Sequence, residues 1–452
     1  KRTYCQCVCR SRDRAHWTSL PRQRTGQSPG TDRVSALGME LLAPAGNFEK
    51  LRVALLYGAD AIYCAGPEFG LRSGAENFSD HELTQAVAYA HERGRKLYIT
   101  LNAFLHDADL VRLPEFVRFL NEIAVDAVIV SDLGVMSVIQ QHSRIPIHLS
   151  TQASCLNSWS ARFWKQMGAT RLILGREVSI TEAETIGRKV GIEVELFIHG
   201  AMCSAYSGHC VISNYTAGRD SNRGGCVQSC RMPYEVVTDS ITNYELGIKN
   251  SNHQPPATVQ TLMSSKDLRG IRLLPKFVGA GIASAKIEGR MKGPLYAATT
   301  VRTYAEALRW LRTQPPETWP ERLEALSVDL EQLPHRGYTE ASLEQPAEAD
   351  SLQLESGPQG EAELAGVVLE VRPEKSLTVL SRNVFEAGTP LELLPIAGTP
   401  VLLSTLQMRD SSSQPLQRAT PHRLVTFPWV PGALPWTVVR MPRRKQVQQQ
   451  AV

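Results

Sequence analysis

Residues 41–64 read LLAPAGNFEKLRVALLYGADAIYC and contain, in order, a short apolar strand, an amphipathic helix and a second apolar strand. The helix is predicted from Asn47 to Tyr57, where apolar residues recur at helical spacing. The tripeptide Gly58-Ala59-Asp60 then ends the helix and leads directly into the next strand. Strand, helix and strand in this order are typical of a parallel sheet.

The same alternation continues along the chain. Eight short apolar runs are separated by longer helical patterns, at residues 41–43, 61–64, 97–100, 127–130, 147–150, 171–174, 195–198 and 285–288. Eight such units predict an α/β fold, a closed parallel (β/α)₈ barrel of the TIM type. An open doubly wound sheet is the alternative, but no glycine fingerprint follows the first strand.

Composition divides the chain further. The first 38 residues hold eight basic residues against two acidic ones and show no apolar periodicity, and from Gly366 onward short alternating strands predict a small β-barrel-like domain. We therefore expect a disordered basic tail or upstream extension at 1–38, the barrel at 39–312 with a cysteine loop at about 200–235, a helical linker at 313–362, the β domain at 363–442 and a tail at 443–452.

The net charge of +4 is not an argument for RNA binding by the folded part, because the first 38 residues carry more than this excess. No apolar run approaches the roughly 20 residues of a membrane span. A secretory signal pattern is absent as well. These features favour a soluble cytoplasmic protein without a membrane partner.

The nine cysteines are unevenly placed. Cys64 and Cys155 end apolar runs and are expected to be small buried hydrophobes. Four others follow the seventh strand, on the face where barrel enzymes hold their chemistry: Cys203, Cys210, Cys226 and Cys230. Their number fits a [4Fe–4S] or [2Fe–2S] cluster, and glycines in the spacers let the thiolates converge. A zinc site also takes four thiolates, so spacing alone favours iron-sulfur over zinc without excluding zinc.

Further polar residues stand at the predicted strand ends and are expected to face the same pocket. We assign His199, Glu177 and Glu288 as candidate catalytic groups, and Arg72, Asn102, His148, Gln152, Lys286 and Arg290 as candidate substrate-binding groups. The cations among them suit a ligand with two carboxylates, because guanidinium groups pair bidentately with carboxylates. The alternatives are internal salt bridges for the cations and a backbone-satisfied position for His199.

Longer motifs surround the cysteines. The chain has Glu195-x-Phe197-x-His199-Gly200-Ala201-Met202-Cys203, then Ser207-Gly208-x-Cys210-x-x-Ser213, and later Ser264-Ser265-Lys266-Asp267-Leu268, Lys286-Ile287-Glu288-Gly289-Arg290 and His335-Arg336-Gly337-Tyr338-Thr339. With these motifs it resembles the collagenase-like peptidases of unknown catalytic type, several of which are iron-sulfur hydroxylation proteins. The resemblance covers nearly everything after Met39 and is strongest to the tRNA-modifying branch.

The resemblance implies an oxygen-independent, prephenate-dependent hydroxylation of the tRNA wobble uridine to 5-hydroxyuridine. It also implies a [4Fe–4S] cluster on the four clustered cysteines, prephenate as co-substrate, and tRNA and an electron donor protein as partners. Related members hydroxylate a ribosomal RNA cytidine or a ubiquinone precursor. Two other classes stay open: a peptidase, since Cys203 and His209 are close in sequence, and a non-catalytic RNA-binding factor with a structural metal.

Overall fold

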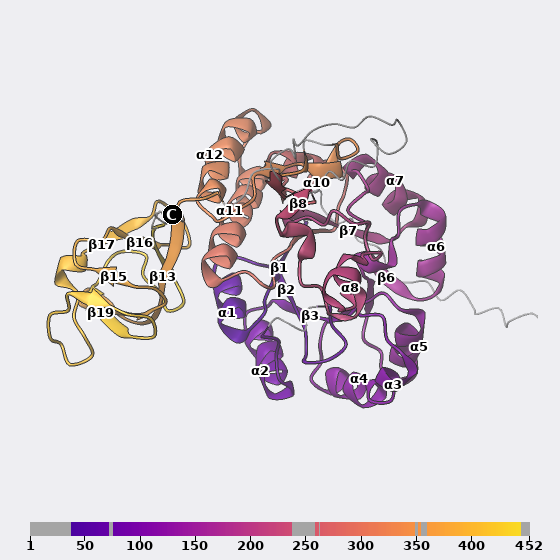
Figure 1. Cartoon of the computed structure of the whole chain (residues 1–452), viewed down its shortest axis with the longest axis horizontal. Coiled ribbons are helices and arrows are strands. Elements are labelled where there is room, and N and C mark those ends of the chain that lie inside the picture. Colours follow the sequence, from indigo (N-terminus) through magenta and orange to yellow (C-terminus); the bar gives the residue numbers. More distant parts are fainter. Residues whose placement is uncertain are drawn as a thin grey trace, which may run out of the picture. The chain divides into compact units, whose positions relative to one another are not determined.

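The computed structural model describes residues 38–71, 76–236, 258–261, 263–348, 351–353 and 359–443. Eight strands form a parallel barrel: β1 Glu40–Pro44, β2 Ala61–Cys64, β3 Lys96–Leu101, β4 Ala127–Val130, β5 Ile147–Leu149, β6 Ala169–Ile173, β7 Glu193–Ala201 and β11 Ser284–Ile287. Strand β11 pairs with both β1 and β7, which closes the barrel. The predicted (β/α)₈ barrel is confirmed, with its strands surrounded by helices (Figure 1).

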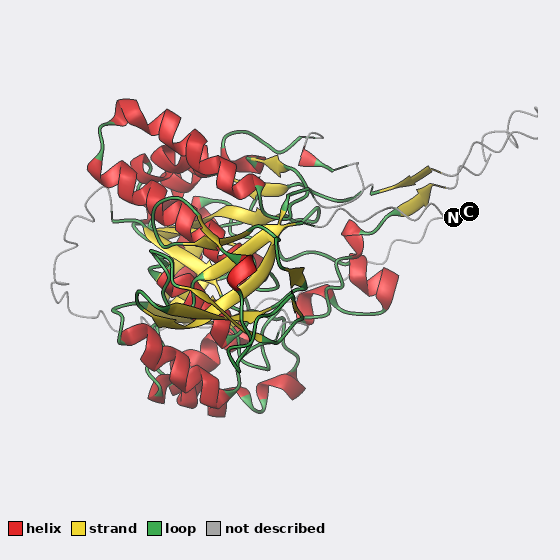
Figure 2. Cartoon of the chain, turned by 90° about the vertical axis from the view of Figure 1, so that its left-hand side faces the viewer, coloured by secondary structure: helices red, strands yellow, loops and turns green. Residues whose placement is uncertain are grey.

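The helices lie outside the strands, as Figure 2 shows. They are α1 Phe48–Leu56, α2 Asp80–His91, α3 Asp107–Leu110, α4 Leu113–Glu122, α5 Leu133–His142, α6 Ser158–Gln166, α7 Ile180–Val190, α8 Ile212–Ala217, α10 Leu274–Gly279, α11 Pro294–Thr313 and α12 Trp319–Glu331. Local sequence sets several of these ends. Ser79 and Ser179 each form a capping box with the glutamate three residues later. Gly191 ends α7 at a φ of 65°, a left-handed conformation that glycine adopts without a Cβ clash.

The barrel core is built from strand residues that the sequence pattern marked as apolar. Leu41, Ile62, Leu97 and Val128 are each fully buried. Burial of one such side chain contributes about 1.5–3 kcal/mol relative to exposure. The isolated cysteines Cys64 and Cys155 are also fully buried, which confirms the expectation that they pack as small hydrophobes.

Strand β7 is nine residues long and extends past its barrel partners. Its last residues pair antiparallel with β10 (Asp267–Arg269), and β12 (Tyr338–Thr339) adds to β10 in parallel. This small extension covers the end of β7 directly before the first clustered cysteine.

A second sheet follows the barrel. Its six strands are β13 Ala362–Arg372, β14 Ser376–Ser381, β16 Leu391–Leu394, β17 Val401–Leu403, β19 Leu424–Pro428 and β20 Val438–Pro442. Two further strand pairs lie outside this sheet: β15 Phe385–Glu386 pairs with β18 Arg418–Ala419, and β8 Tyr234–Val236 pairs with β9 Thr258–Gln260. All six pair antiparallel in the order β17-β16-β20-β13-β14-β19 around their own apolar core, which includes Val368, Phe385 and Phe427. The expected small C-terminal β domain is confirmed as a curled antiparallel sheet.

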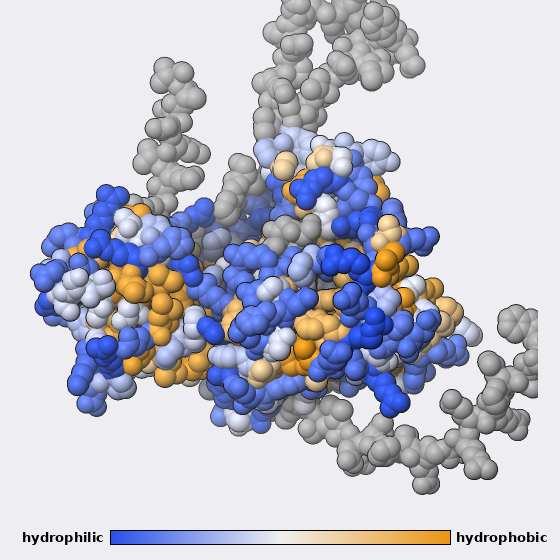
Figure 3. All heavy atoms as spheres, turned by 90° about the horizontal axis from the view of Figure 1, so that it is seen from below, coloured by the Kyte–Doolittle hydropathy of each residue, from blue (hydrophilic) through white to orange (hydrophobic). Residues whose placement is uncertain are grey.

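The predicted tail at 1–38 lies outside the described residues apart from Gly38, as does nearly all of the predicted tail at 443–452. None of the described helices combines the length and apolar character needed to cross a membrane. On the face that Figure 3 shows, hydrophilic side chains cover most of the area and hydrophobic ones gather in a few patches.

Candidate active site

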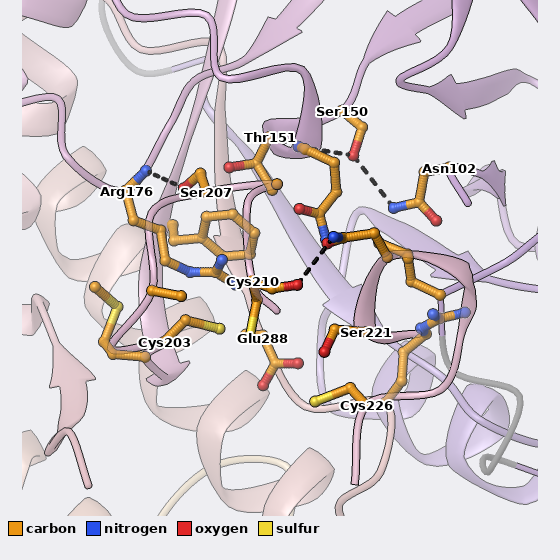
Figure 4. A pocket seen from close by; sticks show the side chains of 18 of the residues that line it. Asn102, Ser150, Thr151, Arg176, Cys203, Ser207, Cys210, Ser221, Cys226 and Glu288 are labelled. Carbon is orange, nitrogen blue, oxygen red and sulfur yellow. Dashed lines mark hydrogen bonds between the residues drawn. The ribbon is translucent and has the colours of Figure 1, made fainter. Parts of the chain in front are cut away.

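A cavity of about 150 Å³ opens at the carboxyl ends of the barrel strands. Because parallel strands all end on the same face, residues far apart in sequence meet there. The lining comes from the ends of strands β2 to β7 and β11, the residues that follow them, and the segment between Met202 and Arg231. Figure 4 shows this cavity, with labelled side chains that follow β3, β5, β6 and β11 and others from the cysteine segment.

All four clustered cysteines line the cavity. Cys203 is exposed, the other three are half-buried, and all four are free thiols. Figure 4 shows three of them, Cys203, Cys210 and Cys226, around the same space. Burial raises the pKa of the Cys230 thiol, Arg231 lowers it, and the charges of Cys203 and Cys226 raise it further, so these sulfurs are within electrostatic reach of one another.

The donor set fits an iron-sulfur cluster in kind and number, since such clusters bind to four thiolates. Within the ranges that the structure describes, however, no three Cys, His, Asp or Glu side chains converge closely enough to hold an ion as they stand. A cluster is larger than a single ion and holds its four thiolates farther apart, so the separation of these side chains does not argue against a cluster.

The segment between Cys203 and Cys210 is fixed to the barrel. The backbone N–H of Ser207 donates to Glu177 Oε1 at 2.9 Å, and Ser207 Oγ accepts from the backbone N–H of Arg176 at 3.2 Å. A Cβ on Gly208 would lie 2.0 Å from the carbonyl oxygen of Gln152, so only glycine fits at this approach.

The later cysteine segment is fixed to the loop after β3. Asn222 Nδ2 donates to the carbonyl oxygen of Cys210 at 2.9 Å. The backbone N–H of Phe104 donates to the carbonyl oxygen of Asn222 at 3.0 Å. Arg223 adds a hydrogen bond to Phe104 O at 2.8 Å and an ion pair with Asp109 at 2.8 Å. Through Asn222, the loop after β3 also supports Cys210.

Positive charge gathers at the cavity. Lys286 and Arg290, which are 4% and 5% exposed, come from the end of β11 and the loop that follows it. Lys286 Nζ donates to Glu195 Oε1 at 2.8 Å, and Arg290 Nη1 donates to Thr100 Oγ1 at 3.1 Å. Burial lowers the pKa of Lys286, and the Glu195 carboxylate opposes this shift. Glu288 is the one carboxylate among the described residues that line the cavity.

Neutral polar groups line the cavity beside these charges. Asn102 Nδ2 donates to Ser150 Oγ at 3.2 Å, and the backbone N–H of Gln152 donates to the same oxygen at 3.3 Å. Three buried oxygen atoms of the lining have no hydrogen-bond partner among the described residues: Asn102 Oδ1, Thr151 Oγ1 and Ser221 Oγ. Buried polar atoms without partners are costly, so a polar group from a ligand or from water is expected to meet these three atoms.

Two histidines lie elsewhere than the sequence pattern suggested. His199 is not among the described residues that line the cavity. From its place on β7 it packs against the rings of Tyr296, Tyr304 and Tyr338. Its Nδ1 lies 3.3 Å from Tyr304 Oη. On β11, Lys286 pairs with Phe197 and the next residue, Ile287, pairs with His199, so β7 has one extra residue between the two pairs. This register shift turns the His199 side chain to the opposite side of the sheet from Phe197. The expectation that His199 faces the pocket is therefore wrong.

His148 also lies outside the lining. It is buried against Tyr98, with 4.8 Å between the ring centroids, and burial lowers its pKa well below the usual value. Glu177 likewise contacts the loop at Ser207 rather than the cavity. Asn102, Gln152, Glu288, Lys286 and Arg290 do line the cavity, while Arg72 lies outside the described residues.

Sequence reasoning missed several lining residues. Arg176 follows the sixth strand, and its guanidinium lies 4.3 Å from the centre of the Phe197 ring. Arg231 directly follows the last clustered cysteine. Position after a strand end is a signal that singles out Arg176, but Ser221 and Arg231 lie in a loop whose path has no periodic pattern.

A family model described as peptidase family U32 matches residues 46–353, which span the barrel and the cysteine segment. The chain belongs to this family. The U32 match includes every clustered cysteine and every described residue of the cavity lining.

Curated relatives match a larger share of the chain than the family model does. The tRNA hydroxylation protein P1 of Bacillus subtilis is 38% identical over 363 residues, which cover 80% of this U32 chain and 84% of that protein. The tRNA hydroxylation protein P of Escherichia coli is 35% identical over 400 residues, or 79% and 86% of the two chains. The 23S rRNA 5-hydroxycytidine C2501 synthase of E. coli is 36% identical over 277 residues, or 61% and 40%.

Proposed function

We propose that this chain is an RNA-modifying enzyme that hydroxylates the wobble uridine of tRNA to 5-hydroxyuridine. The observation that carries the proposal is the 38% identity to a tRNA hydroxylation protein over 80% of the chain, a range that includes most of the molecule rather than the barrel alone. The similarity to an rRNA 5-hydroxycytidine synthase supports the same reaction type on a pyrimidine.

We assign a [4Fe–4S] cluster to Cys203, Cys210, Cys226 and Cys230. Four free thiols that line one cavity support this assignment. When bound, such a cluster supplies one-electron transfer. Replacing C5–H by C5–OH adds an oxygen atom and removes two electrons from the base, so with water as the oxygen source the reaction releases two protons and two electrons. A separate electron carrier protein is therefore proposed as the electron acceptor rather than as a donor, and a one-electron group beside the cavity suits transfer toward it.

The chain's own residues have distinct parts in this proposal. Lys286 and Arg290 bind the carboxylates of prephenate, because two buried cations at one cavity suit an anion with two carboxylates. Glu288 accepts the proton that C5 loses, since it is the carboxylate that the described lining presents. Asn102 and Gln152 bind the polar edge of the base. Glu177 positions the cysteine loop through Ser207 rather than touching substrate.

Nucleoside mass spectrometry tests the proposal. A bacterial strain whose tRNA lacks 5-hydroxyuridine is complemented with this chain, with the Glu288→Gln variant, or with an empty vector. We expect wobble 5-hydroxyuridine only with the unaltered chain and at most traces with the variant. Unmodified tRNA together with 5-hydroxycytidine in ribosomal RNA would redirect the proposal to the second substrate. Gelatin hydrolysis by the purified protein, with both RNAs unmodified, would favour a peptidase.

A further inference from the structure

Tyr206 differs from the other aromatic residues at the cavity. Its side chain is 55% exposed, whereas Tyr63 and Phe197, the other aromatic rings among the described lining residues, are 5% and 7% exposed. Tyr206 lies between Cys203 and Cys210 in sequence. An aromatic face is thus open to solvent at the mouth of the cavity, in the same loop as two of the thiols.

The loop that carries this exposed ring is held firmly. The backbone N–H of His209 donates to the carbonyl oxygen of Tyr206 at 3.1 Å, which makes a tight turn. The next residue, Ser207, is 3% exposed and is bonded to Glu177 and to the backbone of Arg176. An exposed ring on an anchored backbone loses little conformational freedom when a planar ligand binds to it.

The other tyrosines of the cysteine segment are placed differently. Tyr215 is 87% exposed on α8 and does not line the cavity. Tyr234 is half-buried and donates to the carbonyl oxygen of Ser229 at 2.8 Å, so its hydroxyl is part of the loop packing. Of the three tyrosines in this segment, only Tyr206 combines an exposed ring with contact to the cavity.

The cavity behind Tyr206 suits the edge of a nucleobase. Asn102 Oδ1, Thr151 Oγ1 and Ser221 Oγ are buried there without hydrogen-bond partners among the described residues. A pyrimidine presents N–H and carbonyl groups in its plane and apolar faces above and below it. Stacking on a ring at the mouth and hydrogen bonding further in are the two contacts by which proteins hold an unstacked base.

We propose that Tyr206 stacks on the target pyrimidine and holds it, withdrawn from the base stack of the RNA, at the mouth of the cavity. This inference rests on the proposed function, because it takes RNA as the substrate. Cation–π contacts from Arg176 are not required for it, since that guanidinium already lies over Phe197. Tyr206 is then a substrate-binding residue that holds the nucleotide beside the thiols without selecting its base.

Binding of two RNA probes to the anaerobically reconstituted holoprotein tests the stacking. One probe is an anticodon stem-loop with uridine at the wobble position, and the other has an abasic nucleotide there. We expect the unaltered protein to bind the uridine probe about tenfold more tightly than the abasic one, the gain that base stacking typically provides. Tyr206→Leu should reduce this difference to the part that hydrogen bonds inside the cavity supply, and Tyr206→Phe and Tyr206→Trp should retain all of it. Tyr215→Ala is the matched control and should behave as the unaltered chain.

Iron content and 5-hydroxyuridine formation are measured on the same samples. A Tyr206→Leu variant that keeps full iron but prefers the uridine probe clearly less than the unaltered chain does supports the proposal. Equal preference in Tyr206→Leu and the unaltered chain overturns it. If Tyr206→Leu loses iron, Tyr206→Phe and Tyr206→Trp provide the test instead. If both of these variants retain iron but bind the uridine probe no more tightly than the abasic probe, the stacking proposal is overturned. An unaltered protein that prefers the uridine probe but forms no 5-hydroxyuridine refutes the proposed function while leaving the stacking intact.

Discussion

The ammonium group of Lys286 lies 2.8 Å from Glu195 Oε1, with both side chains almost completely buried inside the barrel. Arg171 reaches the other oxygen of Glu195 at 3.4 Å and Glu40 at 2.6 Å, so alternating charges run through the barrel interior. The Lys286 ammonium also lies 4.4 Å from the centre of the Tyr63 ring. These contacts hold Lys286 at the base of the cavity in one orientation.

Removal of the Glu195 charge is expected to destabilise the fold. In Glu195→Gln, Lys286 and Arg171 keep their charges in a buried site without the shared carboxylate, which costs about 3–5 kcal/mol. The double variant Glu195→Gln/Lys286→Met should recover part of this loss, because the unpaired ammonium is gone. Urea unfolding of the two variants and of Lys286→Met measures the coupling, and strictly additive effects would show that the two groups do not interact.

The clustered cysteines are expected to bind iron as a unit. Anaerobically purified protein should be brown with about four irons per chain, and replacing any one of the four by serine should remove most of that iron, because each thiolate holds a corner of the cluster. Cys64→Ala and Cys155→Ala are matched controls, since both thiols are fully buried in the core. Colourless protein with one zinc per chain would contradict the cluster and favour the tetrahedral alternative.

The buried His199 is expected to make stability depend on pH. Burial lowers its pKa from 6.5 to about 3, so the folded chain keeps it neutral while the unfolded chain binds a proton below pH 6.5. Stability is therefore lost as the pH falls from 6.5 toward 3, with a slope of at most about 1.4 kcal/mol per pH unit from this residue.

Replacing His199 by phenylalanine should flatten that dependence, because the aromatic surroundings remain and the titrating group does not. Urea unfolding midpoints between about pH 5 and 7 provide the measurement. His81→Phe, at an exposed position on α2, serves as the control and should keep the slope of the unaltered chain. Equal slopes in all three proteins would mean that His199 takes up its proton in the folded state.

The sequence pattern was sufficient for the barrel and for the cysteine set, for a clear physical reason. Strands inside a ring of helices are buried on both faces, so most of them are continuous apolar runs such as Ala127-Val128-Ile129-Val130. The cysteines follow a strand end, and every strand of a closed parallel barrel ends on one face. No long-range information was needed to place them together.

The direction of individual side chains was harder to predict. Simple alternation along β7 puts Glu195, Phe197 and His199 on one side, but the register shift opposite Lys286 and Ile287 places His199 among the tyrosines of α11 and β12. That shift depends on pairing with β11, about ninety residues later, and leaves no local trace. The exposure of Tyr206 depends in the same way on the contacts of Ser207 with Glu177.

Gly208 offers the sharpest test of how the cysteine loop is seated. Its φ is +81° and an added Cβ would meet the Gln152 carbonyl oxygen at 2.0 Å, whereas Gly218 has a φ of +62° with nothing within 4 Å of the same position. Alanine at either site carries the cost of a left-handed conformation, about 1–2 kcal/mol. Only Gly208→Ala should also displace the loop from the barrel.

We expect Gly208→Ala to lose bound iron and to lower 5-hydroxyuridine formation by about a hundredfold, since small displacements near reacting groups have effects of that size. Gly218→Ala should retain iron and activity, and an equal response of the two variants would show that backbone strain, rather than contact with Gln152, sets the loop.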